Sequence, residues 1–146
     1  MINQEVEILI VEDSMEDAEL AIRALKKNHL ANTIVHLTDG TLALDFIFGR
    51  GEYADRNTHA LPKVILLDLK MPKVNGKEVL QQIKSSPATR SIPVVILTSS
   101  AEDPDIKHCY ELGANSYIVK PVEFENFCKT VSELGMYWMV LNRLKP

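Results

Sequence analysis

The stretch Val64-Ile65-Leu66-Leu67-Asp68 decides the fold of this chain. No polar residue interrupts its four apolar residues, which predicts a strand buried on both faces, as in a parallel sheet. Asp68 then lies at the carboxyl end of that strand, and Met71-Pro72 takes the chain out of the sheet. Ligands and reacting groups of open parallel sheets gather at this edge. The carboxylate of Asp68 is therefore a candidate functional group.

Length and composition favour one globular domain over residues 1–146. The chain has 146 residues with 46% hydrophobic and 25% charged, which is typical of a soluble protein with a real core. A net charge of −4 argues against a general nucleic-acid binder. Cys109 and Cys128 lack the spacing of a zinc site and fit a reducing compartment. Because neither a signal peptide nor a membrane-spanning stretch is apparent, we expect a cytoplasmic protein without membrane insertion.

Strand-like and helix-like stretches alternate along the whole chain. Strands are expected at Val6–Val11, Ile34–Leu37, 64–68, Val94–Leu97 and Tyr117–Val119. Helices are expected after each strand, beginning near Ser14, Gly40, Gly76, Pro104 and Glu123. Right-handed crossovers then predict an α/β fold, with a parallel sheet covered by helices on both faces. We expect the flavodoxin-like doubly wound order 2-1-3-4-5 with five helices.

Two further features qualify this outline. The spacing of Ile106, Cys109 and Tyr110 predicts the inward face of the fourth helix. Residues 49–61 lack any period and predict a long surface loop, of a kind that is often functional or disordered.

Four of the five predicted strands end in residues that can take part in chemistry. These residues are Glu12, Asp13, Asp68, Thr98 and Lys120. Because the carboxyl ends of parallel strands meet at one edge, we expect the five side chains to converge on one cleft.

The chemistry of the set points to phosphoryl transfer. Three carboxylates repel one another unless a hard cation such as Mg²⁺, with Mn²⁺ as a substitute, lies between them. An ammonium from Lys120 and a hydroxyl from Thr98 are groups that stabilise the oxygens of a transferring phosphoryl group. Asp68 is then the nucleophile that forms an acyl phosphate. Each signal alone has a plainer interpretation as a helix cap, a helix-terminal charge or a loop residue; their joint occurrence in this order favours the site.

The sequence resembles the receiver domain of two-component response regulators over nearly its whole length. The matching pieces are Val11-Glu12-Asp13, Leu67-Asp68-Leu69-Lys70-Met71-Pro72, Asn75-Gly76, Leu97-Thr98-Ser99, Gly113-Ala114, Tyr117 and Lys120-Pro121.

The resemblance implies that Asp68 accepts a phosphoryl group from the phosphohistidine of a histidine kinase. It also implies that Asp13, Asp68 and the backbone carbonyl of Lys70 bind Mg²⁺, with Glu12 acting through a metal-bound water.

The resemblance further implies that Thr98 and Tyr117 form a switch pair and that a cis peptide joins Lys120 to Pro121. Without the resemblance, Tyr117 reads as a core aromatic.

The sequence departs from the family pattern near the acceptor. Glu12 stands where Asp is commoner, Lys70 follows the acceptor by two residues, and Ser99 and Ser100 follow Thr98. We expect Lys70, Ser99 and Ser100 to tune the lifetime of the phosphoryl group.

The chain leaves no room for an output domain, so we expect a stand-alone receiver that signals by protein–protein interaction. Residues 49–61 and the stretch 67–72 are similar to single-domain receivers paired with bacterial, including cyanobacterial, phytochrome-type kinases.

The end of the chain predicts an interface. The last helix is expected to extend to about residue 144, and its part over 136–144 is apolar on every side. We expect a homodimer through this helix and the strand-five region, with Tyr137, Trp138, Val140 and Leu141 in the contact. The alternative is that the 49–61 loop covers this face.

Three other functions are alternatives to the receiver. A haloacid-dehalogenase-type phosphatase needs an acid/base Asp where Lys70 stands. A flavin mononucleotide binder would bring its phosphate against Glu12-Asp13, which repel it. A degenerate receiver acting as a phosphorylation-independent scaffold remains open. We expect no enzyme activity beyond the chain's own phosphorylation and dephosphorylation.

Overall fold

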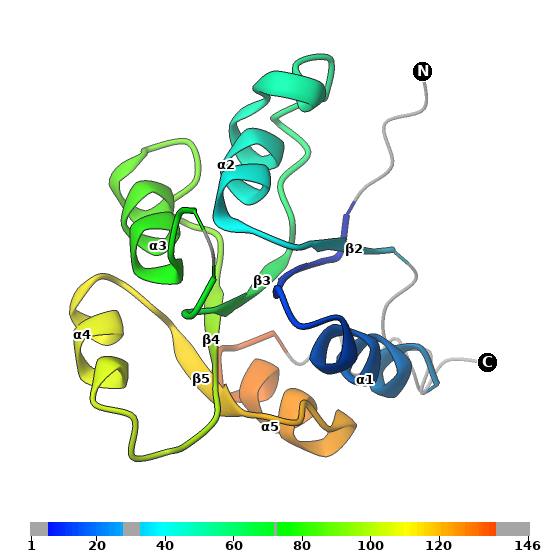
Figure 1. Cartoon of the computed structure of the whole chain (residues 1–146), viewed down its shortest axis with the longest axis vertical. Coiled ribbons are helices and arrows are strands. Elements are labelled where there is room, and N and C mark those ends of the chain that lie inside the picture. The colour runs from blue at the N-terminus through cyan, green and yellow to red at the C-terminus, as the bar shows by residue number, and fades with distance from the viewer. Residues whose placement is uncertain (1–5, 28–32, 72, 137–146) are drawn as a thin grey trace.

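The computed structural model describes residues 6–27, 33–71 and 73–136. Figure 1 shows a central sheet with helices on both faces. The strands are β1 (Ile8–Val11), β2 (Ile34–Leu37), β3 (Val64–Asp68), β4 (Val94–Thr98) and β5 (Ser116–Val119). The helices are α1 (Met15–Lys27), α2 (Gly40–Phe48), the 3₁₀ turn η1 (Gly51–Tyr53), α3 (Gly76–Ser85), α4 (Asp105–Glu111) and α5 (Phe124–Glu133).

The sheet has the predicted topology. Its strand order is β2-β1-β3-β4-β5, and every neighbouring pair is parallel. The flavodoxin-like doubly wound fold is thereby confirmed. β3 lies in the middle and all five of its residues are buried, which explains its uninterrupted apolar sequence.

Alternate residues of the strands feed two separate cores. Ile65 and Leu67 of β3 pack with apolar side chains of α2, α3 and α4, whereas Val64 and Leu66 pack with those of α1 and α5. This division agrees with the two helical layers in Figure 1. Helices therefore pack against both faces of the sheet, and the carboxyl ends of its strands lie together at one edge.

Side-chain caps fix where the helices start. The Ser14 hydroxyl accepts the Asp17 N–H at 3.2 Å ahead of α1, and Asp39 accepts the Leu42 N–H at 2.8 Å ahead of α2. Asn75 accepts the Glu78 N–H at 3.0 Å ahead of α3. Each cap satisfies a backbone donor that has no partner within its helix.

The prediction of a continuous last helix to about residue 144 is wrong, because α5 ends at Glu133. Gly135 has a φ of +79°. Its N–H donates to the Ser132 carbonyl at 3.0 Å, and the Met136 N–H donates to the Val131 carbonyl at 2.7 Å. These two bonds form a Schellman motif that closes the helix. Residues 137–144, including the predicted contact residues Tyr137, Trp138, Val140 and Leu141, lie outside the described residues.

The structure corrects one prediction about α4 and adds detail to the predicted 49–61 surface loop. Tyr110 does not face the core: it is 45% exposed, while Cys109 beside it is buried. The 49–61 loop is built around η1 and a half-buried arginine. Arg56 donates to the carbonyls of Phe46 and Ala60, and its guanidinium lies 4.0 Å from the centre of the Phe46 ring. This loop is thus fastened to α2.

Candidate functional site

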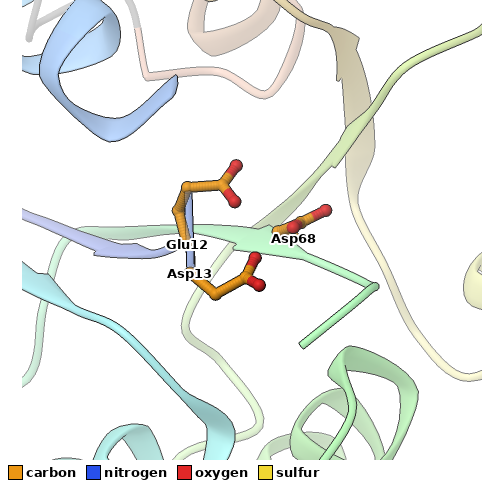
Figure 2. Close-up of side chains that lie close together, drawn as sticks. All are labelled: Glu12, Asp13 and Asp68. Carbon is orange, nitrogen blue, oxygen red and sulfur yellow. The ribbon is translucent and has the colours of Figure 1, made fainter. Parts of the chain in front are cut away.

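Three carboxylates meet at the carboxyl ends of β1 and β3. Figure 2 shows Glu12, Asp13 and Asp68 with their carboxyl groups turned toward a common space. Their ligand oxygens lie within 4.8 Å of one another. Glu12 and Asp68 are buried, whereas Asp13 is exposed. The convergence expected from the sequence is therefore present.

One ammonium group neutralises part of this charge. Lys120 follows β5, and its Nζ lies 2.8 Å from Glu12 Oε1, 3.1 Å from Asp17 Oδ2 and 3.6 Å from Asp68 Oδ1. Asp17 lies in the first turn of α1 and is a member of the site that the sequence analysis does not identify.

The electrostatics of the site depend on burial. Burial raises the pKa of Glu12 to about 7, and the neighbouring Asp68 adds to this, while the hydrogen bond from Lys120 opposes it. Burial acts to lower the pKa of Lys120, but its hydrogen bonds to Glu12 and Asp17 outweigh burial and raise the pKa above its usual range. Glu12 is thus poised to exchange a proton near neutral pH, and Lys120 stays charged.

We expect Glu12→Gln to stabilise the metal-free protein at pH 8 by about 2 kcal/mol and to change little at pH 4. The folded-state pKa of about 7 lies above the ordinary value of 4.5, so the folded chain binds this proton more tightly. The stabilisation from that proton is complete below the ordinary pKa and is lost as the pH rises through about 7. Glutamine keeps the neutral form at every pH.

Urea denaturation in EDTA at both pH values measures the difference. The exposed Glu111→Gln is the matched control and should change stability equally at the two pH values. An equal gain at pH 4 and pH 8 for Glu12→Gln would contradict the assignment of the proton to Glu12.

Thr98 is buried at the carboxyl end of β4. Asp68 pairs with Leu97, the residue before Thr98, so the two functional residues occupy neighbouring strands. The Lys120 N–H donates to the Thr98 carbonyl at 2.7 Å, which ties the two predicted phosphoryl-binding residues together through the backbone. The Thr98 hydroxyl has Asp103 Oδ2 and the Ser100 carbonyl as acceptors, each at 3.1 Å.

Tyr117 lies on β5, opposite Ile96 of β4, and is half-buried against the core on the α2–α4 face. Its ring meets the ring of Tyr110 edge to face, with the centroids 6.5 Å apart. Tyr110 therefore covers Tyr117 instead of filling the core. A half-buried ring next to an exposed one has room to change its packing.

The loops after β3 and β4 carry the remaining predicted residues. Lys70 is exposed, as are Ser99 and Ser100 after β4. Gly76 closes the loop: its N–H donates to the Leu69 carbonyl at 3.0 Å. A Cβ at Gly76 would lie 2.4 Å from the Asp68 carbonyl oxygen, so only glycine allows this approach.

The donor set fits a hard divalent cation. The oxygens of three carboxyl groups at the ends of two strands lie close together, and the Lys120 ammonium compensates only part of their negative charge. Such cations prefer oxygen ligands of this kind. The acidic cluster can therefore hold a metal ion.

The response regulator receiver domain family matches residues 8–132. The chain belongs to this family. Among curated relatives of this receiver domain, the probable methanogenesis regulatory protein FilR2 of Methanothrix harundinacea (strain 6Ac) is 43% identical over 93% of this chain and 85% of its own length.

Solved structures place the receiver domain among regulators of the same kind. The bacteriophytochrome response regulator AtBRR is 50% identical with a TM-score of 0.84, over 92% of this chain and 96% of that chain. The Mn²⁺-bound form of Rcp1, a response regulator of Synechocystis sp. (strain ATCC 27184 / PCC 6803 / Kazusa), is 37% identical with a TM-score of 0.73. That match covers 92% of this chain and 94% of that chain. The receiver domain thus acts in two-component signalling and is similar to phytochrome response regulators.

No helix within the described ranges is long and apolar enough to span a membrane. The described cysteines form no disulfide, and Cys109 is buried.

Proposed function

We propose that this receiver domain is a phosphoacceptor and that Asp68 receives the phosphoryl group of a histidine kinase. In this transfer the P–N bond of the phosphohistidine breaks while a P–O bond to an Asp68 carboxylate oxygen forms, and the imidazole leaves with the electron pair. The observation that carries the proposal is the position of Asp68 beside Glu12 and Asp13 and 3.6 Å from the Lys120 ammonium.

The other residues have separate roles in the proposal. Asp13, Asp68 and the Lys70 backbone carbonyl hold Mg²⁺, or Mn²⁺ in its place, and Glu12 contributes through a water molecule. The bound cation supplies charge stabilisation to the phosphoryl oxygens. Lys120 and Thr98 bind the same oxygens after transfer, and Tyr117 changes its packing with Thr98.

Incubation with acetyl phosphate and Mg²⁺, followed by intact-protein mass spectrometry, tests the proposal. The wild type should gain one phosphoryl group, and Asp68→Asn should gain none because an amide is not a nucleophile. The exposed Asp55→Asn loses one carboxylate outside the site and should be phosphorylated at the wild-type rate. An unmodified wild type would favour the alternative of a phosphorylation-independent scaffold.

The kinase is proposed to dock beside the acceptor. Exposed large apolar side chains in the described ranges are Met15, Leu20 and Tyr110, and two of them lie on α1, next to the acidic cluster. Leu20 also lines a shallow groove with Pro121 and Val122, the residues after Lys120. An apolar patch rimmed by charges fits a protein partner. By analogy with AtBRR, the partner is a phytochrome-type kinase.

Leu20→Ala is expected to slow phosphoryl transfer from the cognate kinase about tenfold, because an apolar anchor of an interface is lost. Its rate with acetyl phosphate should be unchanged, since the small donor needs no docking. Lys107→Ala truncates an exposed side chain of α4, on another surface, and serves as the control. An equal loss with both donors would place the effect of Leu20 in the site instead of the docking surface.

The remaining parts of the proposal concern output. The chain signals in the cytoplasm by protein–protein interaction, with a homodimer through the end of the chain and the strand-five region. Lys70, Ser99 and Ser100 tune the phosphoryl lifetime. Catalysis is limited to the chain's own phosphorylation and dephosphorylation; Lys70 in place of a second aspartate argues against a phosphatase.

A further inference from the structure

The Thr98 hydroxyl already has a carboxylate as a hydrogen-bond acceptor. This carboxylate belongs neither to the proposed phosphoacceptor, Asp68, nor to the proposed metal ligands. Asp103 Oδ2 lies 3.1 Å from Thr98 Oγ. The Ser100 carbonyl is the competing acceptor at 3.1 Å, while the Ser100 N–H donates to the same hydroxyl oxygen at 3.3 Å. A hydroxyl has one hydrogen, and an ionised carboxylate is the stronger acceptor. Asp103 is therefore the principal partner of the Thr98 hydroxyl.

The second oxygen of Asp103 is bonded to the next helix. Asp103 Oδ1 accepts the N–H of Asp105, the first residue of α4, at 2.9 Å. That N–H lowers the pKa of Asp103, and Thr98 and the ammonium groups of Lys70 and Lys77 act in the same direction. The carboxylate thus stays ionised at neutral pH. One side chain joins the end of β4 to the start of α4.

We propose that Asp103 is a positioning residue that holds the Thr98 hydroxyl hydrogen in the unphosphorylated chain. The inference rests on the proposed function of Asp68. A phosphoryl group on Asp68 has to compete with Asp103 for the hydrogen bond from the Thr98 hydroxyl, because one hydroxyl cannot donate fully to both acceptors. When it succeeds, one of the two bonds that fasten Asp103 between β4 and α4 is lost.

The Thr98–Asp103 bond therefore disfavours the phosphorylated form. Because Asp103 is also bonded to Asp105, loss of this bond couples phosphorylation to the start of α4. Part of the interaction energy of the phosphoryl group is used to break the Thr98–Asp103 bond. A variant that lacks this bond should reach the phosphorylated arrangement more readily.

The affinity for beryllofluoride in excess Mg²⁺, measured by isothermal titration calorimetry, tests the inference. In Asp103→Asn, the amide oxygen can still accept the Asp105 N–H, while its NH₂ group faces Thr98 and cannot accept. We expect beryllofluoride to bind about tenfold more tightly, the worth of one hydrogen bond to a charged acceptor. Asp103→Ser, whose hydroxyl oxygen can also accept the Asp105 N–H, should show the same direction of change.

Two comparisons separate this role from a general effect of charge. Glu102→Gln removes one negative charge from the neighbouring exposed residue and should leave the affinity unchanged. In a Thr98→Val background, where no hydroxyl is present, Asp103→Asn should also leave the affinity unchanged.

The outcomes are distinct. Unchanged affinity in Asp103→Asn and Asp103→Ser, or an equal gain in the wild-type and Thr98→Val backgrounds, would overturn the role of Asp103 while leaving Asp68 as the acceptor. If the wild type itself fails to bind beryllofluoride, the proposed function fails and this inference falls with it.

Discussion

Lys120→Met is expected to slow phosphorylation by acetyl phosphate about a hundredfold. The Lys120 ammonium lies 3.6 Å from Asp68 Oδ1 and is placed to meet the negative charge of an incoming phosphoryl group. Methionine has a similar length and lacks the charge. The remaining carboxylates would then repel the donor.

The same substitution is expected to destabilise the metal-free protein by about 3 kcal/mol at pH 8. Glu12 would be left buried without its ammonium partner at 2.8 Å. The cost should be smaller at pH 5, because the pKa of Glu12 is already raised to about 7 and its carboxyl group is then protonated. Destabilisation that is larger at pH 5 than at pH 8 would refute this account.

Lys84→Met provides the matched control. Lys84 is also partly buried, but its Nζ donates to the Arg90 and Ile92 carbonyls and to Asn115 instead of a carboxylate. Its replacement should lower stability without slowing phosphorylation. Initial rates by mass spectrometry and urea denaturation at both pH values measure the two effects.

Gly76→Ala is expected to destabilise the protein by about 2 kcal/mol and to slow phosphorylation about a hundredfold. Its Cβ would lie 2.4 Å from the Asp68 carbonyl oxygen and 2.6 Å from the Leu69 Cα, and both neighbours are backbone atoms that have little freedom to move. The loop must shift, and the Asp68 carboxylate and Lys70 carbonyl shift with it.

Gly135→Ala makes the same chemical change away from the site. Apart from its chain neighbours, no heavy atom of the described residues lies within 4 Å of its added Cβ, but its φ of +79° disfavours alanine. This variant should lose about 1 kcal/mol and keep the wild-type rate of phosphorylation. If Gly76→Ala also kept the wild-type rate, the tight contact would be a matter of stability alone.

Much of the site could be predicted because it depends on strand ends. Asp68, Asp13 and Lys120 follow apolar strands of a parallel sheet, and topology alone brings such residues to one edge. Asp17 and Asp103 could not be found in this way. Each lies in or just before a helix. Its role depends on one side-chain contact, that of Asp17 with Lys120 or that of Asp103 with Thr98, and the spacing of apolar residues does not predict such a contact.

The errors have equally local causes. The fourth helix spans only seven residues, too few for its spacing to define a face, and Tyr110 turned outward to cover Tyr117. The end of α5 was missed because the apolar residues after it resemble a helix. Gly135 is the residue that could have predicted this helix end from the sequence, since a glycine in the left-handed region commonly ends a helix.

The order of the sheet has a consequence for amide hydrogen exchange. β3 is bonded to strands on both sides, whereas β5 is bonded within the described sheet to β4 alone. Local opening is therefore expected to cost more around Asp68, in the middle strand, than around Tyr117, in an edge strand. The backbone that carries the proposed phosphoacceptor is thus expected to exchange its amide hydrogens more slowly than the edge strand that carries Tyr117.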